Sequence, residues 1–167
     1  KSKNWIGNGQ LIPAGPLREK ISSLKRFDAI FLNGSLDNFE KIENQIKNIN
    51  LDIKIFKTFY KISNIKKYNL DSKYFIFSGI GDPSDFKNIL LENKFKIARE
   101  AIFPDHYKYN LKDLEEIQNI AKDESLKIIT TEKDFMKIPE KFKKEIDYLT
   151  IDLVIQDEKK LIELITR

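Results

Sequence analysis

The sequence contains no cysteine and only one histidine, His106, among its 167 residues. The absence of cysteine excludes disulfide bonds, thiolate nucleophiles and cysteine-ligated zinc, and it is compatible with a reducing compartment. With a single histidine in addition, a dedicated transition-metal site is not expected, whereas Mg2+ held through carboxylates and phosphates stays open. We therefore assign no residue of this chain as a metal ligand.

Long apolar runs and a strong excess of one charge are also missing. No apolar stretch reaches about 18 residues, the length that a membrane-spanning helix needs. Hydrophobic residues make up 41% of the chain and charged residues 34%, as in ordinary globular proteins. The 30 basic and 26 acidic residues alternate, which predicts a solvated surface, although the small basic excess could favour an anionic membrane surface. No basic stripe carries interleaved aromatic residues, so nucleic acid is not expected as a partner.

The segments that are present alternate between strand-like and helix-like patterns. This order predicts an α/β fold over residues 27–167, with a mostly parallel sheet flanked by helices. Residues 53–63 alternate apolar and polar side chains, which predicts a strand with one wet face, either an edge strand or a ribbon, although Phe56 and Phe59 break the alternation. The expected core includes five side chains from the apolar strands, namely Ile30, Ile76, Phe77, Ile128 and Ile129.

Three of the expected strands end in polar or glycine-bearing sequence. The first ends at Gly79 and Gly81, the second leads into Asp105 and His106, and the third runs into Thr131-Glu132-Lys133-Asp134. Because the carboxyl ends of parallel strands lie at one edge of a sheet, we expect these segments to converge. If the third segment continues as extended chain, its successive side chains point in opposite directions.

Each of these segments has a functional and a structural interpretation. His106 could act at a site, since histidine is a common acid or base in proteins, or it could occupy an ordinary surface turn. Lys133 could bind phosphate and its acidic neighbours could orient Mg2+, or the charges could cap a turn in solvent. Gly79 and Gly81 resemble half of a dinucleotide-binding fingerprint, but they also suit a tight turn.

The amino-terminal stretch is rich in glycine and proline and then enters a predicted short helix over residues 17–27. Asn8 and Gly9 lie in the expected loop, and Arg18 and Glu19 fall in the first turn of the expected helix. A guanidinium in that position suits a bidentate contact with phosphate. Glu19 is favourably placed for the helix dipole.

Four of these stretches together resemble a known family. The stretches GNGQLIPAGPLRE, FSGIGDP, FPDHY and TTEKD occur in this order. They resemble the carboxyl-terminal half of the tetraacyldisaccharide 4′-kinases, the lipid A kinases of Gram-negative bacteria, over residues 7–154. The resemblance implies transfer of the γ-phosphoryl group of ATP, with Mg2+, to the 4′-hydroxyl of the lipid A disaccharide precursor, at the cytoplasmic face of the inner membrane.

The resemblance also implies roles for individual residues. His106, with Asp105, would face the nucleotide cleft and orient a catalytic carboxylate of the P-loop domain. Asn8, Gly9, Arg18 and Glu19 would line the substrate or phosphate region. The nucleotide-side loops would be those that hold Gly79, Gly81, Glu132, Lys133 and Asp134.

The chain departs from the family pattern because it contains no G-x-x-x-x-G-K-[ST] phosphate loop. We therefore interpret residues 1–26 as the tail of the kinase domain and residues 27–167 as a Rossmann-like carboxyl-terminal domain, inactive by itself. ATP and Mg2+ would bind mainly through the domain outside this sequence, as would the membrane surface. Two alternatives remain: a free-standing α/β module that binds a phosphorylated ligand, and a Rossmann-like enzyme that uses His106 as acid or base.

Overall fold

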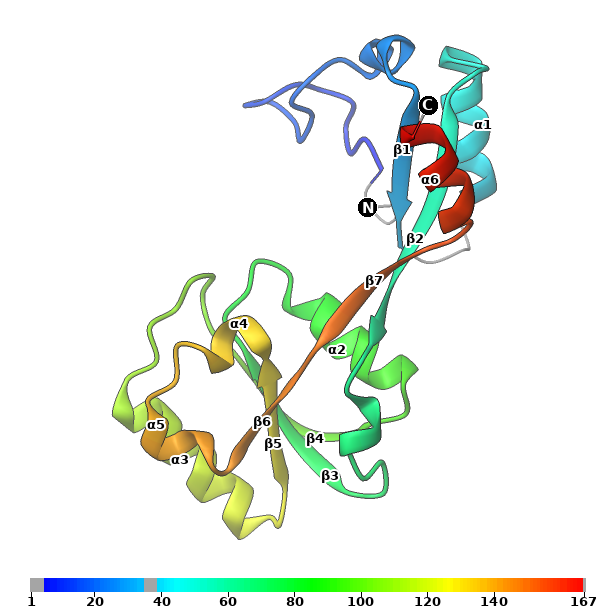
Figure 1. Ribbon diagram of the computed structural model, residues 1–167. Helices are drawn as coiled ribbons and strands as arrows, with labels where there is room; N and C mark the ends of the chain where they lie inside the picture. The colour runs from blue at the N-terminus through cyan, green and yellow to red at the C-terminus, as the bar shows by residue number, and fades with distance from the viewer. Residues whose placement is uncertain (1–4, 35–38, 167) are drawn as a thin grey trace. The chain divides into compact units, whose positions relative to one another are not determined.

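The computed structural model describes residues 5–34 and 39–166 and divides the chain into two compact units (Figure 1). Unit 1 combines residues from the range 1–60 with residues from the range 153–167, and unit 2 is the continuous stretch 61–152. Unit 2 is therefore inserted into unit 1. The predicted division at residue 26 does not coincide with a boundary between these units, because residues 29–33 pair within unit 1.

Unit 1 is built on a three-stranded sheet in the order β1-β2-β7. β1 (Ala29–Asn33) and β2 (Lys54–Ile62) are parallel, and α1 (Phe39–Ile49) forms the crossover between them. β7 spans Ile151–Ile155, α6 spans Glu158–Ile165, and a 3-10 helix, η1, spans Ile21–Arg26. The core of the unit consists of apolar side chains from β1, α1 and the start of β2, namely Leu32, Phe39, Ile42, Ile46 and Ile53.

β2 is the central strand of this sheet, so the prediction that it lies at an edge is wrong. Its backbone bonds on both sides: Lys54 N–H donates to Asp28 at 2.8 Å, and Gln156 N–H donates to Lys57 at 2.8 Å. The alternating pattern instead reflects the two faces of the strand, because the Thr58 side chain faces the interior and is buried, whereas the Phe59 side chain stays 47% exposed.

Unit 2 contains a four-stranded sheet in the order β4-β3-β5-β6, and all of its strand pairs are parallel. The strands span Lys73–Ser78 (β3), Lys96–Ile102 (β4), Lys127–Thr131 (β5) and Ile146–Leu149 (β6). The helices span Pro83–Glu92 (α2), Leu111–Asp123 (α3), Glu132–Phe135 (α4) and Glu140–Lys143 (α5), and a short 3-10 helix, η3, spans Ile65–Lys67. This is the α/β architecture that the alternating pattern predicts, although the chain forms two sheets instead of one.

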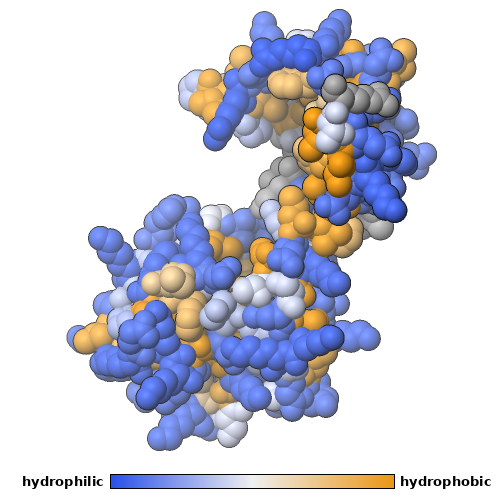
Figure 2. Space-filling view, in the orientation of Figure 1, coloured by the Kyte–Doolittle hydropathy of each residue, from blue (hydrophilic) through white to orange (hydrophobic). Residues whose placement is uncertain are grey.

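Helices cover both faces of the unit 2 sheet, and successive residues of β3 show how. Phe75 and Phe77 pack with α3 and α5, whereas Tyr74 and Ile76 pack with α2 on the other face. Strands buried on both faces need continuous apolar runs, which explains the sequence KYFIFS of β3. Hydrophilic residues cover most of the visible surface of this unit (Figure 2).

The predicted core residues are confirmed in unit 2 and only partly in unit 1. Ile76, Phe77, Ile128 and Ile129 are buried, with Ile128 and Ile129 facing opposite sides of β5. Ile30 is half-buried and packs at the margin of the unit 1 core. Among the described residues, no helix combines the length and the apolar character needed to cross a bilayer.

Candidate functional site

The loops that follow β3, β4 and β5 meet at one edge of the unit 2 sheet, as their parallel order requires. We call residues 78–83, 103–107 and 131–134 the strand-end site. Beyond the paired strands, Phe103 N–H donates to Ser78 at 2.9 Å and His106 N–H donates to Gly79 at 3.2 Å. The convergence expected from the topology is therefore present in the structure.

His106 occupies a tight turn and is presented to solvent. Tyr107 N–H donates to the Pro104 carbonyl at 3.1 Å, which closes a four-residue turn with His106 at its third position. The φ of His106 is 60°, in the left-handed region that costs a non-glycine residue about 1–2 kcal/mol. Its side chain is nevertheless 74% exposed. The backbone strain thus holds an accessible imidazole, a combination common at functional sites.

Two charged side chains lie beside this imidazole. The Asp105 carboxylate lies 3.9 Å from His106 Nε2 through one oxygen and 3.6 Å from Lys133 Nζ through the other. All three groups are about half exposed or more. Asp105, His106 and Lys133 thus form an accessible cluster with one anion, one fixed cation and one titratable group, which suits binding and orientation of a phosphate-bearing ligand.

The chain does not stay extended beyond Thr131, so the alternating side-chain directions expected for an extended segment do not arise. Thr131 ends β5 in an extended conformation, and α4 begins at Glu132, with the Thr131 hydroxyl accepting a hydrogen bond from Asp134 N–H at 3.1 Å as the N-cap. Glu132 and Lys133 are exposed, whereas Asp134 is fully buried. The helical turn therefore leaves the charges of Glu132 and Lys133 in solvent and places the Asp134 carboxylate in the interior.

The Asp134 carboxylate is held by three protein donors. It accepts hydrogen bonds from Gly79 N–H at 2.9 Å, from the Thr131 hydroxyl at 2.8 Å and from Lys137 Nζ at 2.8 Å. Burial alone would raise the pKa of Asp134, but these donors outweigh it and hold the pKa below its usual value. Asp134, which the motif groups with the nucleotide-side residues, is placed to bind the β3 loop instead.

Gly79 lies where three segments crowd together. A Cβ atom at this position would lie 3.0 Å from the Tyr109 hydroxyl oxygen and 3.2 Å from the Pro104 carbonyl oxygen. At Gly81 the nearest atom to such a Cβ would be an Asp105 carboxylate oxygen, at 3.4 Å. The two glycines therefore allow the β3 loop to approach the histidine loop, and this packing accounts for them without a dinucleotide.

Tyr109 lies beneath this contact. Its hydroxyl is buried and makes no hydrogen bond of ordinary geometry within the described chain. Burial and the nearby Asp134 carboxylate both raise its pKa. The ring packs edge-on against Phe77, Phe103 and Tyr107. An aromatic cluster thus supports the floor of the strand-end site, which the sequence alone did not indicate.

In unit 1, the amino-terminal loop is ordered by its own polar groups. The Asn8 side chain donates to Ala14 at 2.9 Å and accepts from Gln10 N–H at 3.1 Å, and Gly9 adopts a φ of 75°. Asn8 and Gly9 therefore have structural roles in this loop. This loop belongs to unit 1, whereas the strand-end site belongs to unit 2.

The two charged residues after this loop differ in their environment. The predicted helix over residues 17–27 is shorter, a 3-10 helix that begins at Ile21, so Arg18 and Glu19 precede it. Glu19 pairs with Arg26 at 2.5 Å. Arg18 is exposed and takes part in no ion pair within the described residues. Arg18 is thus the member of this group that remains accessible to an anion.

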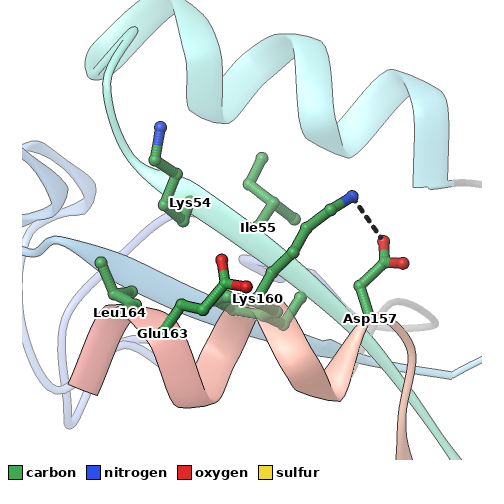
Figure 3. Close-up of a pocket in the computed structure, with 7 residues that line it drawn as sticks. Lys54, Ile55, Asp157, Lys160, Glu163 and Leu164 are labelled. Carbon is green, nitrogen blue, oxygen red and sulfur yellow. Dashed lines mark hydrogen bonds and ion pairs between the residues drawn. The ribbon is translucent and has the colours of Figure 1, made fainter. Parts of the chain in front are cut away.

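A surface pocket of about 310 Å³ lies in unit 1 between β2 and α6 (Figure 3). Its lining includes Lys54 and Lys160 but also Asp157 and Glu163, and Lys160 pairs with Asp157 at 3.3 Å. The opposite charges compensate each other, and none of the residues predicted to function lines this pocket. Across the part of the chain that the structure describes, no three side chains from His, Asp and Glu gather to hold a metal ion.

Comparison with known proteins gives a consistent result. The family model for LpxK, tetraacyldisaccharide-1-P 4′-kinase, matches residues 1–167. The tetraacyldisaccharide 4′-kinase of Pelagibacter ubique is 45% identical over 158 residues, which are 95% of this chain and 50% of that protein. The kinase of Elusimicrobium minutum is 33% identical over 175 residues, covering 95% and 46%.

A solved structure matches the fold. LpxK from Aquifex aeolicus, crystallised in complex with ATP, superposes with a TM-score of 0.61 at 24% sequence identity. The match covers 96% of this chain and 48% of that one. The chain thus spans about half the length of the relatives it matches.

Proposed function

Because the chain belongs to the tetraacyldisaccharide-1-phosphate 4′-kinase family, we propose that it is part of an enzyme that phosphorylates the 4′-hydroxyl of this lipid. The γ-phosphoryl group of ATP would be transferred in a step of lipid A biosynthesis. The observation that carries this proposal is the family match over residues 1–167. That match favours a kinase part over a free-standing ligand-binding module or an independent Rossmann-like enzyme.

In this enzyme the strand-end site would border the nucleotide. Lys133 would contact phosphate, and His106 would orient a catalytic carboxylate supplied by the rest of the kinase. The support for this role is geometric: the imidazole is exposed, lies beside Asp105 and belongs to a turn closed by the hydrogen bond from Tyr107 N–H to Pro104. Such an oriented group acts on charge that develops in the transition state.

The amino-terminal loop would serve the acceptor. Arg18 is accessible and carries the planar guanidinium that best matches a phosphate, so we assign it to the lipid 1-phosphate. Magnesium would bind mainly through the part of the kinase outside this sequence, together with the phosphates of ATP. We place the enzyme at the cytoplasmic face of the bacterial inner membrane, where ATP and the membrane-embedded lipid meet, with the membrane contact made by the rest of the kinase.

The test is His106→Ala in a full-length kinase that carries this sequence. A positioned proton-transfer group typically contributes 10²- to 10⁴-fold, and an orienting group should contribute less. We therefore expect kcat to fall about 10- to 100-fold, with a smaller change in the KM for ATP. Steady-state kinetics on the lipid substrate, together with a melting curve, measure both quantities.

Lys108→Ala provides the control, because Lys108 is exposed in the same loop and takes part in no ion pair within the described residues. This variant should keep its kcat. A near-wild-type kcat for folded His106→Ala would show that His106 is only a turn residue. Absence of kinase activity in the unmodified full-length protein would contradict the proposed function itself.

A further inference from the structure

Asp134 is a buried carboxylate within the strand-end site, and the proposed reaction assigns it no chemical role. We propose that Asp134 is a positioning residue that fixes the histidine loop through Gly79. This inference rests on the proposed function for its kinetic consequence, but its structural part can be tested independently. Asp134 is fully buried and belongs to α4, whereas His106 is exposed and follows β4. A connection between them must therefore pass through a third segment.

The loop after β3 provides that connection through both polar groups of Gly79. The N–H of Gly79 donates to Asp134 at 2.9 Å, and the carbonyl of Gly79 accepts from His106 N–H at 3.2 Å. One residue thus links the internal carboxylate to the backbone of the histidine. A displacement of the Asp134 carboxylate would therefore displace the His106 backbone through these two hydrogen bonds, because hydrogen bonds are sensitive to both distance and direction.

Close packing removes the freedom that a single residue would otherwise have. A Cβ atom at Gly79 would lie 3.2 Å from both the Pro104 carbonyl oxygen and the Tyr107 Cβ, so even a methyl group would force the histidine loop to shift. The histidine loop therefore rests directly on the Gly79 backbone. If Gly79 moves, this loop has to move as well.

Asp134 is itself held rigidly. Its carboxylate accepts from the Thr131 hydroxyl and from Lys137 in addition to Gly79, and its own N–H is bound to Thr131. A buried carboxylate with all of these donors has one favourable orientation. The anion would thus act as a fixed point from which the β3 loop and the histidine turn are placed. A purely structural ion pair would stabilise the fold without affecting His106.

The experiment replaces Asp134 by asparagine in the full-length kinase. Asp134→Asn keeps the shape of the side chain but replaces one acceptor oxygen by an amide NH2 group. This donor would face either the Gly79 N–H and the Thr131 hydroxyl or the Lys137 ammonium, all of which are donors too. We expect amide hydrogen exchange in residues 103–107 to become about 10-fold faster or more, because the loop loses its anchor. Asp123→Asn, the same change at an exposed site on α3, should leave this exchange unchanged.

A double-mutant cycle supplies the kinetic readout. Asp134→Asn should lower kcat about 10-fold with little change in the KM for ATP, since small displacements of a catalytic group are costly. Combined with His106→Ala it should cause no further loss, because both changes remove the same contribution. Unchanged exchange in folded Asp134→Asn would overturn the proposal, as would full additivity of two effects on kcat.

Two other results are informative. If His106→Ala keeps normal turnover, the role proposed for His106 fails, and the exchange data alone decide whether Asp134 positions the loop. If Asp134→Asn does not fold, Thr131→Val replaces it, since this change removes one donor to Asp134 and keeps the volume of the side chain. Faster exchange in residues 103–107 of Thr131→Val supports the proposal, and unchanged exchange overturns it.

Discussion

Tyr107 and Tyr109 stand two residues apart in the aromatic cluster, but their hydroxyl groups have opposite environments. The Tyr107 hydroxyl donates to Asp113 at 3.0 Å. The Tyr109 hydroxyl is buried without a hydrogen bond of ordinary geometry in the described chain. A buried hydroxyl without a partner costs about 1–3 kcal/mol, whereas a satisfied one contributes about 0.5–1.5 kcal/mol.

We therefore expect the two Tyr→Phe substitutions to have effects of opposite sign. Tyr109→Phe should raise the free energy of unfolding by about 1 kcal/mol, because it removes an unsatisfied group. Tyr107→Phe should lower it by about 0.5–1.5 kcal/mol, because it removes a bond to Asp113. Urea denaturation of the chain measures both. A loss of stability in Tyr109→Phe would mean that its hydroxyl donates to Asp134 after all.

The residue scale is also where prediction from sequence reached its limit. The polar strand ends identified His106, Asp105 and Lys133 as neighbours, because parallel topology alone brings them together. The same pattern could not separate Asp134 from Lys133. Their separation depends on the Thr131 cap, which starts a helical turn and directs one side chain inward. A threonine followed three residues later by an acidic residue is a capping signal that favours helix over extended chain.

At the scale of elements, α3 illustrates how a helix is specified locally. Asn110 caps it and forms a capping box with Asp113, and the apolar residues Leu114, Ile117 and Ala121 lie on the buried face. Both signals are readable in the sequence, where they predict a helix over residues 111–124, and the structure agrees with this range to within one residue. β2 was harder to place, because period-two alternation does not reveal whether a strand has one neighbour or two.

Two leucines of α3 allow a matched test of this packing. Leu114 is fully buried, whereas Leu111 is 50% exposed on the same helix. Leu114→Ala should lower the free energy of unfolding by about 2–5 kcal/mol, because it removes transfer energy and leaves a cavity. Leu111→Ala should stay within about 0.5 kcal/mol, as is usual for surface positions. Equal losses at the two positions in denaturant titrations would refute the assigned helix face.

At the scale of the whole molecule, the strand-end site would supply only part of the machinery for the proposed phosphoryl transfer. That reaction depends mainly on positioning and on stabilisation of charge by a phosphate loop and metal ions. The sequence has no phosphate-loop motif, and the described residues form no metal-binding group. Composition and motifs predict that the phosphate loop and most of the metal site belong to the rest of the kinase. They could not predict that residues 27–60 form strands of a separate sheet. Such pairing depends on the distant β7.

We expect the 167-residue chain alone to transfer no measurable phosphate from ATP to the disaccharide lipid. Incubation of the purified chain with radiolabelled ATP and the lipid tests this, with a full-length kinase as the positive control. Radiolabel in the lipid product, formed by the chain alone, would contradict the expectation. It would also require a phosphate-binding element that this sequence does not reveal.

The insertion of unit 2 has a consequence for the order of folding. Residues 61–150, which hold all four strands of the unit 2 sheet, leave the ribosome before β7 and α6, so this sheet can be complete while unit 1 still lacks its third strand. The ends of this stretch are joined, since Ser63 N–H donates to Thr150 at 2.9 Å. Once unit 2 is folded, the ends of β2 and β7 are connected by an ordered segment instead of a long flexible loop. The loss of loop-closure entropy on pairing these two strands is therefore much smaller.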